Sequence, residues 1–286
     1  MKQIIKKILE KNNLIINKVH KVHLSNLDSP IDAIYYNGKF GGRQLFSFDV
    51  PIEKCVNIYG YQFHLPSSHH FTATLVEYAK NPNIRFKDSK LCKFYEGFTP
   101  ENLKTLYFSY SNLESINHNN DSPLLCYNPQ VITLPWLPDI VYTTSEVNGK
   151  ERSEAGLSFK EGSQSFGPVS QAKGNLEFSR LINTYNSISS KGYTVDYFHN
   201  QISGYFIKSD SDYRFIIQNG NHRTASLAAL GIKSIPVIFR YDYPRVIDIN
   251  DVELWPQVKN GNVTKCDAES IFYAMFQGKD FSAIFN

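Results

Sequence analysis

The stretch QNGNHRTASLAALGIKSIPVIF, residues Gln218–Phe239, carries the clearest structural pattern in the chain. Apolar residues precede it, and Gly220 is followed at once by Asn221, His222 and Arg223. An alanine-rich helical pattern comes next, and a second glycine leads into the β-branched run SIPVIF. The pattern predicts a strand that enters a helix directly, with the polar triplet at the helix N-terminus, and then a buried strand.

Two patterns before this stretch extend the same architecture. The segment LEFSRLINTYNSISSKGY, 176–193, places apolar residues at helical spacing, and we expect its helix to end at Gly192. The segment ISGYFIKSDSDYRFIIQNG, 202–220, predicts a β-hairpin with its turn at Ser209–Asp212. The expected order in this half is therefore helix, hairpin, helix, strand.

The N-terminal half mixes strand and helix patterns. Residues 14–75 favour strands, and a helical pattern begins near Phe71 and ends at Asn81. Two shorter helices are expected at 89–98, capped by Asp88 or Ser89, and at 99–108. Residues 127–150 carry prolines without periodicity and predict an irregular segment.

Length and composition bound the fold class and the partners. The 286 residues suffice for one large domain or two smaller ones, and 42% hydrophobic residues can build a packed core. Thirty basic and 27 acidic side chains give a net charge of +3, which does not favour a partner such as nucleic acid. We predict an α+β protein, with a β-rich and helical N-terminal region at 1–150 and a second domain at 151–286.

The cysteines and the N-terminus favour a cytoplasmic location. No two cysteines form a CxxC motif, and we expect four reduced, mostly buried thiols, at Cys55, Cys92, Cys126 and Cys266. The segment MKQIIKKILEKNN, 1–13, has neither the apolar run nor the cleavage site of a signal peptide. It predicts a basic amphipathic helix, for which packing on the protein is favoured over lying on a membrane.

The motifs of the second half, taken together, resemble the ParB/sulfiredoxin superfamily over about residues 165–240. The motifs are SISSKGY (187–193), ISGYFI (202–207), RFIIQNGNHRTASLAALG (214–231) and SIPVIF (234–239). Members of that superfamily share a strand that runs into Gly-x-His-Arg or Gly-x-Arg-Arg, then a helix and an Ile-Pro-Val-like strand. The resemblance implies a ParB/sulfiredoxin-like C-terminal fold whose junction binds the phosphates of a nucleotide. Its members include CTP-binding partition proteins, sulfiredoxins and kinases that phosphorylate free serine.

A looser resemblance concerns three other segments. FGPVSQAKGNLEFSRL, SKLCKFYEGFTPENL and ELWPQVKNGNVTKCDAESIFYAMF are similar to parts of bacterial proteins from surface-polysaccharide gene clusters. This resemblance implies a setting, surface-polysaccharide biosynthesis, more than a reaction.

The chemistry of the junction agrees with the resemblance. The first N–H groups of a helix lack partners within it, and the helix dipole is positive at that end. Gly220 lets the backbone approach an anion, and Asn221 and His222 add side-chain donors. Arg223 can bind two phosphate oxygens at once, and Thr224 can cap the helix or donate. Residues 220–224 therefore predict a phosphate site.

An ordinary structural interpretation of the triplet stays open beside this one. In it Asn221 caps the helix, His222 is a buried imidazole with a partner, and Arg223 forms a surface ion pair. The position at a strand-to-helix junction favours phosphate binding. Because Asn221 stands where sulfiredoxins hold their reactive cysteine, sulfinic-acid reduction is disfavoured. The aromatic, nearly neutral segment 267–286 does not favour a DNA-binding role.

A catalytic base is expected in GPVSQAKGNLEFSRL. On a helix, Lys173, Glu177 and Arg180 would share one face. The serine-kinase relatives use a glutamate near the start of the equivalent helix, and the resemblance therefore implies Glu177 as the base. Ser170, Lys173 and Arg180 are then candidate phosphate ligands, while a surface ion-pair ladder is the alternative. The glycines and proline of 167–174 predict a tight loop that leads to Glu177.

Three histidines in FHLPSSHHF raise the question of a metal. His64, His69 and His70 have no Asp, Glu or Cys at matching spacing, so solvent-facing or helix-capping roles are expected. His69 or His70 lining a substrate pocket is the alternative. We predict no metal site formed by the protein.

The function expected from these patterns is phosphoryl transfer from ATP or another nucleoside triphosphate, with Mg²⁺, to a small hydroxyl-bearing acceptor. A sugar or glycan precursor fits the looser resemblance, and Glu177 and His222 are the expected catalytic residues. A nucleotide-binding or nucleotide-hydrolysing switch without kinase activity is the alternative, and a nuclease is the third possibility. The low net charge disfavours the nuclease.

Overall fold

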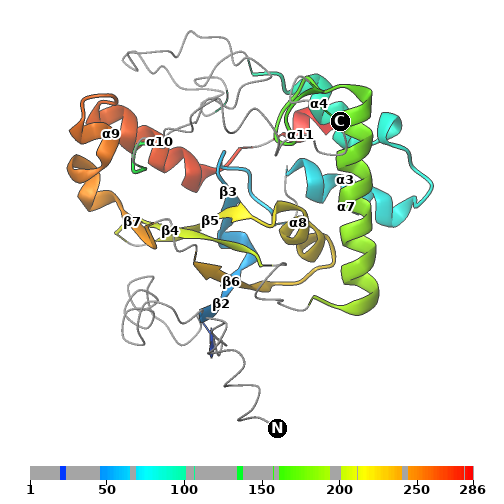
Figure 1. Cartoon of the computed structure of the whole chain (residues 1–286), viewed down its shortest axis with the longest axis horizontal. Helices are drawn as coiled ribbons and strands as arrows, with labels where there is room; N and C mark the ends of the chain where they lie inside the picture. The colour runs from blue at the N-terminus through cyan, green and yellow to red at the C-terminus, as the bar shows by residue number, and fades with distance from the viewer. Residues whose placement is uncertain are drawn as a thin grey trace, which may run out of the picture.

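The computed structural model describes residues 20–23, 46–64, 69–100, 106, 134–137, 157, 161–193, 201–210, 212–239, 244–279 and 281–285. The helices expected at 1–13 and 99–108 and the irregular segment at 127–150 lie wholly or largely outside these residues. Within them the chain is α+β, with helices around a mixed sheet (Figure 1).

The sheet has seven strands in the order β1-β2-β6-β4-β5-β3, and β7 also pairs with β4. The strands are β1 (His20–His23), β2 (Phe46–Pro51), β3 (Cys55–Asn57), β4 (Ser203–Lys208), β5 (Tyr213–Asn219), β6 (Ser234–Phe239) and β7 (Val246–Asp248). The pairs β2/β6 and β4/β5 are antiparallel, and the other four pairs are parallel. The antiparallel pair β4/β5 confirms the predicted hairpin.

Helices cover both faces of this sheet. They are α3 (His70–Lys80), α4 (Lys90–Gly97), α7 (Gln171–Lys191), α8 (Asn221–Ala229), α9 (Pro256–Lys259), α10 (Lys265–Gln277) and α11 (Ser282–Phe285). Three short 3-10 turns complete the described elements: Ile52–Lys54 between β2 and β3, Phe86–Asp88 between α3 and α4, and Ile249–Leu254 between β7 and α9. The predicted end of the first helix at Asn81 and the predicted Ser89 cap of the next are confirmed.

Alternation along β4 and β5 explains the layers. Phe206 and Phe215 point into a cluster shared with α3, α4, α7 and α8, whereas Tyr205 and Ile216 point into a second cluster shared with α10. Successive side chains of a strand face opposite sides of a sheet, so burial on both faces needs a nearly continuous apolar run. Figure 1 shows α3, α7 and α8 on one side of the sheet and α9 and α10 on the other.

The two halves of the sequence share this framework. β2 pairs with β6, and β3 pairs with β5, so strands from before residue 150 complete the sheet of the second half. The larger hydrophobic cluster also combines side chains from both halves, among them Phe71, Phe94, Leu181 and Ile217. Among the described residues, the expected division at 150/151 therefore does not separate two sheets or two cores.

The order helix, hairpin, helix, strand is confirmed for α7, β4/β5, α8 and β6. One boundary differs, because α7 begins at Gln171 rather than near residue 176. Ser170 caps it by accepting a hydrogen bond from the N–H of Lys173. The tight loop predicted over 167–174 therefore ends at Ser170, and Gly174 lies inside the helix, where its missing side chain makes room for the ring of Phe86.

The described cysteines are free thiols, and their exposure differs. Cys55 is buried, Cys92 is half-buried and Cys266 is exposed, so the expectation of mostly buried thiols holds only in part; Cys126 lies outside the described residues. No helix among the described residues combines the length and apolar character needed to cross a bilayer.

Candidate functional site

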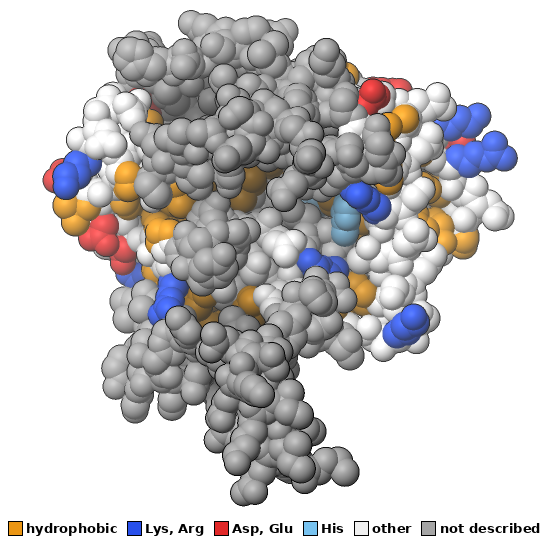
Figure 2. Space-filling view, viewed as in Figure 1, with side chains coloured by type: hydrophobic (Ala, Val, Ile, Leu, Met, Phe, Trp, Pro, Cys, Tyr) orange, Lys and Arg blue, Asp and Glu red, His pale blue; other side chains and the backbone are white. Residues whose placement is uncertain are grey.

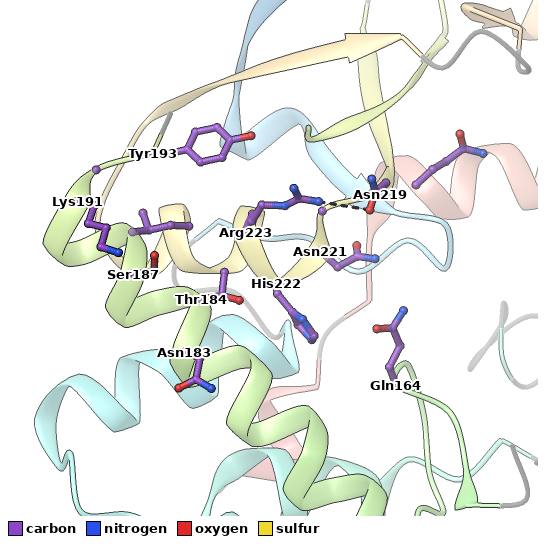
Figure 3. Close-up of a pocket in the computed structure, with 14 residues that line it drawn as sticks. Gln164, Asn183, Thr184, Ser187, Lys191, Tyr193, Asn219, Asn221, His222 and Arg223 are labelled. Carbon is purple, nitrogen blue, oxygen red and sulfur yellow. Dashed lines mark hydrogen bonds between the residues drawn. The ribbon is translucent and has the colours of Figure 1, made fainter. Parts of the chain in front are cut away.

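A cavity of about 620 Å³ opens between the C-terminal half of α7 and the N-terminus of α8. Asn183, Ser187 and Lys191 line it from α7, and the start of α8 lines the facing side. Figure 3 shows Lys191 and Tyr193 at one end of the cavity and Gln164 at the other. In Figure 2, basic side chains and a histidine lie over α8, whereas the acidic side chains in view lie toward the rim of the molecule.

Gly220 forms the corner at which β5 becomes α8. It is the N-cap residue, with a left-handed φ of 100°, a conformation that favours glycine. A Cβ there would lie 3.0 Å from Cγ1 of Ile202. Asn221 is the first helical residue and not the cap, which overturns that part of the ordinary interpretation. Because glycine has no side chain with which to cap, the first N–H groups of α8 remain available to an anion.

Arg223 supplies the main positive charge at this end of α8. Its side chain lines the cavity, and its guanidinium donates to Oδ1 of Asn219 at 3.4 Å. Burial lowers the pKa of Arg223, as expected for a cation in a partly desolvated pocket. With Lys191 it makes the described lining cationic, since no described carboxylate lines the cavity. This arrangement favours an anionic ligand.

Glu177 lies behind the cavity wall and is fully buried. Its Oε1 accepts a hydrogen bond from Nζ of Lys173 at 2.6 Å and lies 3.6 Å from the guanidinium of Arg180. The predicted common face of these three side chains is confirmed. Burial alone would raise the pKa of Glu177, but the neighbouring His222 and Lys173 outweigh it and lower the pKa to about 2.

His222 connects this buried carboxylate to the cavity. Its Nε2 is buried and lies 3.3 Å from Oε2 of Glu177, while the side chain as a whole is 20% exposed. The ring also packs on Phe71, with centroids 4.5 Å apart. Nε2 therefore faces the buried carboxylate, and Nδ1 is the ring nitrogen on the side away from Glu177.

The other predicted phosphate ligands do not line the cavity. Ser170 caps α7, and Lys173 and Arg180 surround Glu177. Thr224 is buried, and its hydroxyl donates to the carbonyl of Gly220 at 3.0 Å. Gly220, Asn221, His222 and Arg223 are thus the predicted phosphate-binding residues that reach the cavity.

The N-terminal histidines have different roles from one another. His69 caps α3 by accepting from the N–H of Phe71, as one prediction had it. His70 is buried rather than solvent-facing, and neither histidine lines the cavity. Within the described ranges, no cluster of three or more His, Cys, Asp or Glu side chains could hold a metal ion.

Several cavity residues escaped the sequence patterns. On α7, Asn183, Ser187 and Lys191 recur at intervals of four, which places them on one helix face. That polar row was a usable signal. Gln164 left none, because it lies in an irregular segment seven residues before the helix begins.

No family model, curated protein or solved structure matches this chain. The resemblance to the ParB/sulfiredoxin superfamily therefore stays a prediction, and a function has to be argued from the cavity itself.

Proposed function

We propose that this protein is a nucleotide-dependent phosphotransferase that moves a phosphoryl group from a nucleoside triphosphate to a small hydroxyl-bearing acceptor. We propose with it that the segment from α7 to β6 is a ParB/sulfiredoxin-like fold. The observation that carries the proposal is one cavity that joins an open helix N-terminus, two cations and a carboxylate-backed histidine.

The phosphate chain would bind at the start of α8. The free N–H groups of its first turn and the fork of Arg223 suit the oxygens of a polyphosphate. Lys191 adds a second cation farther along the cavity. Among the described residues the cavity offers no carboxylate to hold the expected Mg²⁺, so the ion would be held by the nucleotide's own phosphate oxygens.

His222 is the group best placed for proton transfer. The acceptor hydroxyl would give its proton to Nδ1 while its oxygen bonds to the terminal phosphorus and the bond to the leaving phosphate oxygen breaks. Glu177 would stabilise the resulting imidazolium through Nε2. A buried carboxylate with a pKa of about 2 is a weak base, so we assign Glu177 a positioning role rather than the base role expected for it.

The first experiment measures nucleotide binding. Isothermal titration with ATP, CTP and GTP, each with Mg²⁺, should give saturable binding for at least one of them. Arg223→Ala should weaken it by about 10- to 100-fold, because a charge-assisted bond is lost. Arg85→Ala is the matched control, since Arg85 is exposed and lies outside the cavity. Unchanged affinity in Arg223→Ala would remove the proposed phosphate site.

The second experiment measures transfer. With a panel of sugars, polyols and amino acids, ³¹P NMR should detect a phosphorylated product that His222→Gln no longer forms although it still binds nucleotide. Glu177→Gln should lower the turnover rate less than His222→Gln does. Binding without turnover across the panel would instead support a nucleotide-binding switch.

A further inference from the structure

Two residues at the start of α3 contact residues that line one end of the cavity. His70 contacts the backbone of Gln164, and Phe71 packs on the ring of His222. Gln164 and His222 both line the cavity, and Figure 3 shows them near one another at the end opposite Lys191. Residues of the N-terminal half therefore support the cavity wall from behind.

The contact from His70 has a defined geometry. Nε2 lies 3.1 Å from the carbonyl oxygen of Gln164, and the ring stacks on Phe94 with centroids 4.1 Å apart and planes 7° apart. Burial lowers the pKa of His70 to about 3, so the imidazole is neutral and carries one N–H. Because its partner is a carbonyl, that N–H lies on Nε2. The Tyr95 hydroxyl donates to the same oxygen at 2.9 Å.

The residues after Gln164 are held in the same way. The hydroxyl of Tyr61 donates to the carbonyl of Ser165 at 3.2 Å, and the N–H of Gly167 donates to the carbonyl of Phe98 at 2.9 Å. A Cβ on Gly167 would overlap the backbone of Tyr95, so the two backbone segments are in direct contact. The backbone from which the Gln164 side chain projects is thus held by buried groups from the N-terminal half.

We infer that Gln164 is a ligand-contacting residue that selects an uncharged, hydroxyl-bearing compound, and that His70 and Tyr95 are its positioning residues. A carboxamide both donates and accepts, which matches a hydroxyl, while the cations lie at α8 and at the far end of the cavity. The inference rests on the proposed function only in naming this compound as the phosphoryl acceptor. The same end holds His222, which would take the hydroxyl proton.

The test uses ligand-observed NMR with neutral monosaccharides and polyols as probes and L-serine as the charged competitor. We expect neutral compounds to bind and serine to bind at least tenfold more weakly, which is about 1.4 kcal/mol. Gln164→Ala should weaken binding of the neutral probe by about 10- to 100-fold, to a level that is still measurable, while nucleotide affinity is unchanged. Tyr95→Phe and His70→Phe, which keep the rings and remove the donors, should each weaken it by about tenfold through misplacement of Gln164.

Tyr78→Phe is the matched control. Tyr78 lies on α3, and its hydroxyl accepts a hydrogen bond from Asn186 of α7 instead of contacting residue 164. This variant should bind the probes like the wild type. Combining Tyr95→Phe with Gln164→Ala should add nothing to Gln164→Ala alone, whereas a purely structural role of Tyr95 would add its own loss.

The outcomes separate this inference from the proposed function. If neutral probes bind through Gln164 and the protein binds no nucleotide, the inference is supported and the proposed phosphotransferase function is contradicted. The inference itself is overturned if no neutral hydroxyl compound binds, or if Gln164→Ala binds as the wild type does. If His70→Phe does not fold, Tyr95→Phe carries the positioning test.

Discussion

Two histidines, His222 at the start of α8 and His70 at the start of α3, both pack against the ring of Phe71. The centroid of that ring lies 4.5 Å from His222 and 4.1 Å from His70. His222 reaches the cavity and has a buried carboxylate behind it, whereas His70 is wholly buried and donates to a main-chain carbonyl. The same side chain thus reaches the cavity from one helix and fills the interior from the other.

The difference lies in what surrounds each ring. Burial lowers the pKa of His70 to about 3, so its ring is neutral and donates a hydrogen bond to the carbonyl of Gln164. His222 instead lies beside the carboxylate of Glu177, which orients its ring at the cavity wall. The C-terminal segment therefore supplies the chemical groups of the cavity, and the N-terminal half supplies much of their positioning.

The largest expected effect comes from removing the carboxylate behind His222. Glu177→Leu leaves Lys173 buried beside an apolar side chain, and we expect it to lower the free energy of unfolding by about 3–5 kcal/mol. Urea denaturation measures this loss. The double variant Lys173→Met/Glu177→Leu should recover most of it, because the buried ammonium is then removed together with the carboxylate. A loss below 1 kcal/mol would mean that Glu177 is not the buried anchor of this region.

The same carboxylate predicts how stability depends on pH. Its pKa is about 2 in the folded protein and about 4.5 when unfolded, so the unfolded state binds more protons between these values. The stabilisation is complete above about pH 4.5 and is lost as the pH falls toward 2, by about 3 kcal/mol in total. Urea denaturation at several pH values measures the slope. Glu177→Gln should remove that part of it, and an identical slope in this variant would contradict the assignment.

A smaller effect tests how closely the N-terminal half packs on α7. Gly174→Ala would bring a Cβ to within 2.0 Å of Cζ of Phe86, a rigid and buried ring. We expect a loss of about 1–3 kcal/mol from overpacking, although alanine is the better helix former. Asn175→Ala, at the exposed neighbouring position, is the control and should not destabilise. If both variants were equally stable, the contact between α7 and Phe86 would not be close.

The structure of the C-terminal segment could be predicted from the sequence because its signals are local. Gly220 before a polar triplet and an alanine-rich run marks a strand-to-helix junction within a few residues, and α8 begins there. The spacing of Lys173, Glu177 and Arg180 predicted their common face but not its burial. Burial depends on what packs against α7, and no local spacing encodes that.

The N-terminal side was less predictable for the same reason. His69 and His70 stand beside each other, and their local pattern predicts the cap on α3 but not the burial of both rings. The carbonyl that His70 contacts belongs to Gln164, 94 residues away. A contact of that range follows only from the way β2 and β3 join the sheet of the second half. The residues that support the cavity wall could therefore be identified only from the folded structure.

The smallest expected effect distinguishes two roles for Ser170. As a phosphate ligand it would raise nucleotide affinity; as the N-cap of α7 it stabilises the helix through the N–H of Lys173. Ser170→Ala should cost about 1 kcal/mol of stability, measured by urea denaturation, and leave nucleotide affinity unchanged. Ser170→Asp should restore the stability, because aspartate caps equally well, and should also leave the affinity unchanged. An affinity that falls in both variants, most in Ser170→Asp, would return Ser170 to the phosphate site, since a carboxylate there would repel the nucleotide.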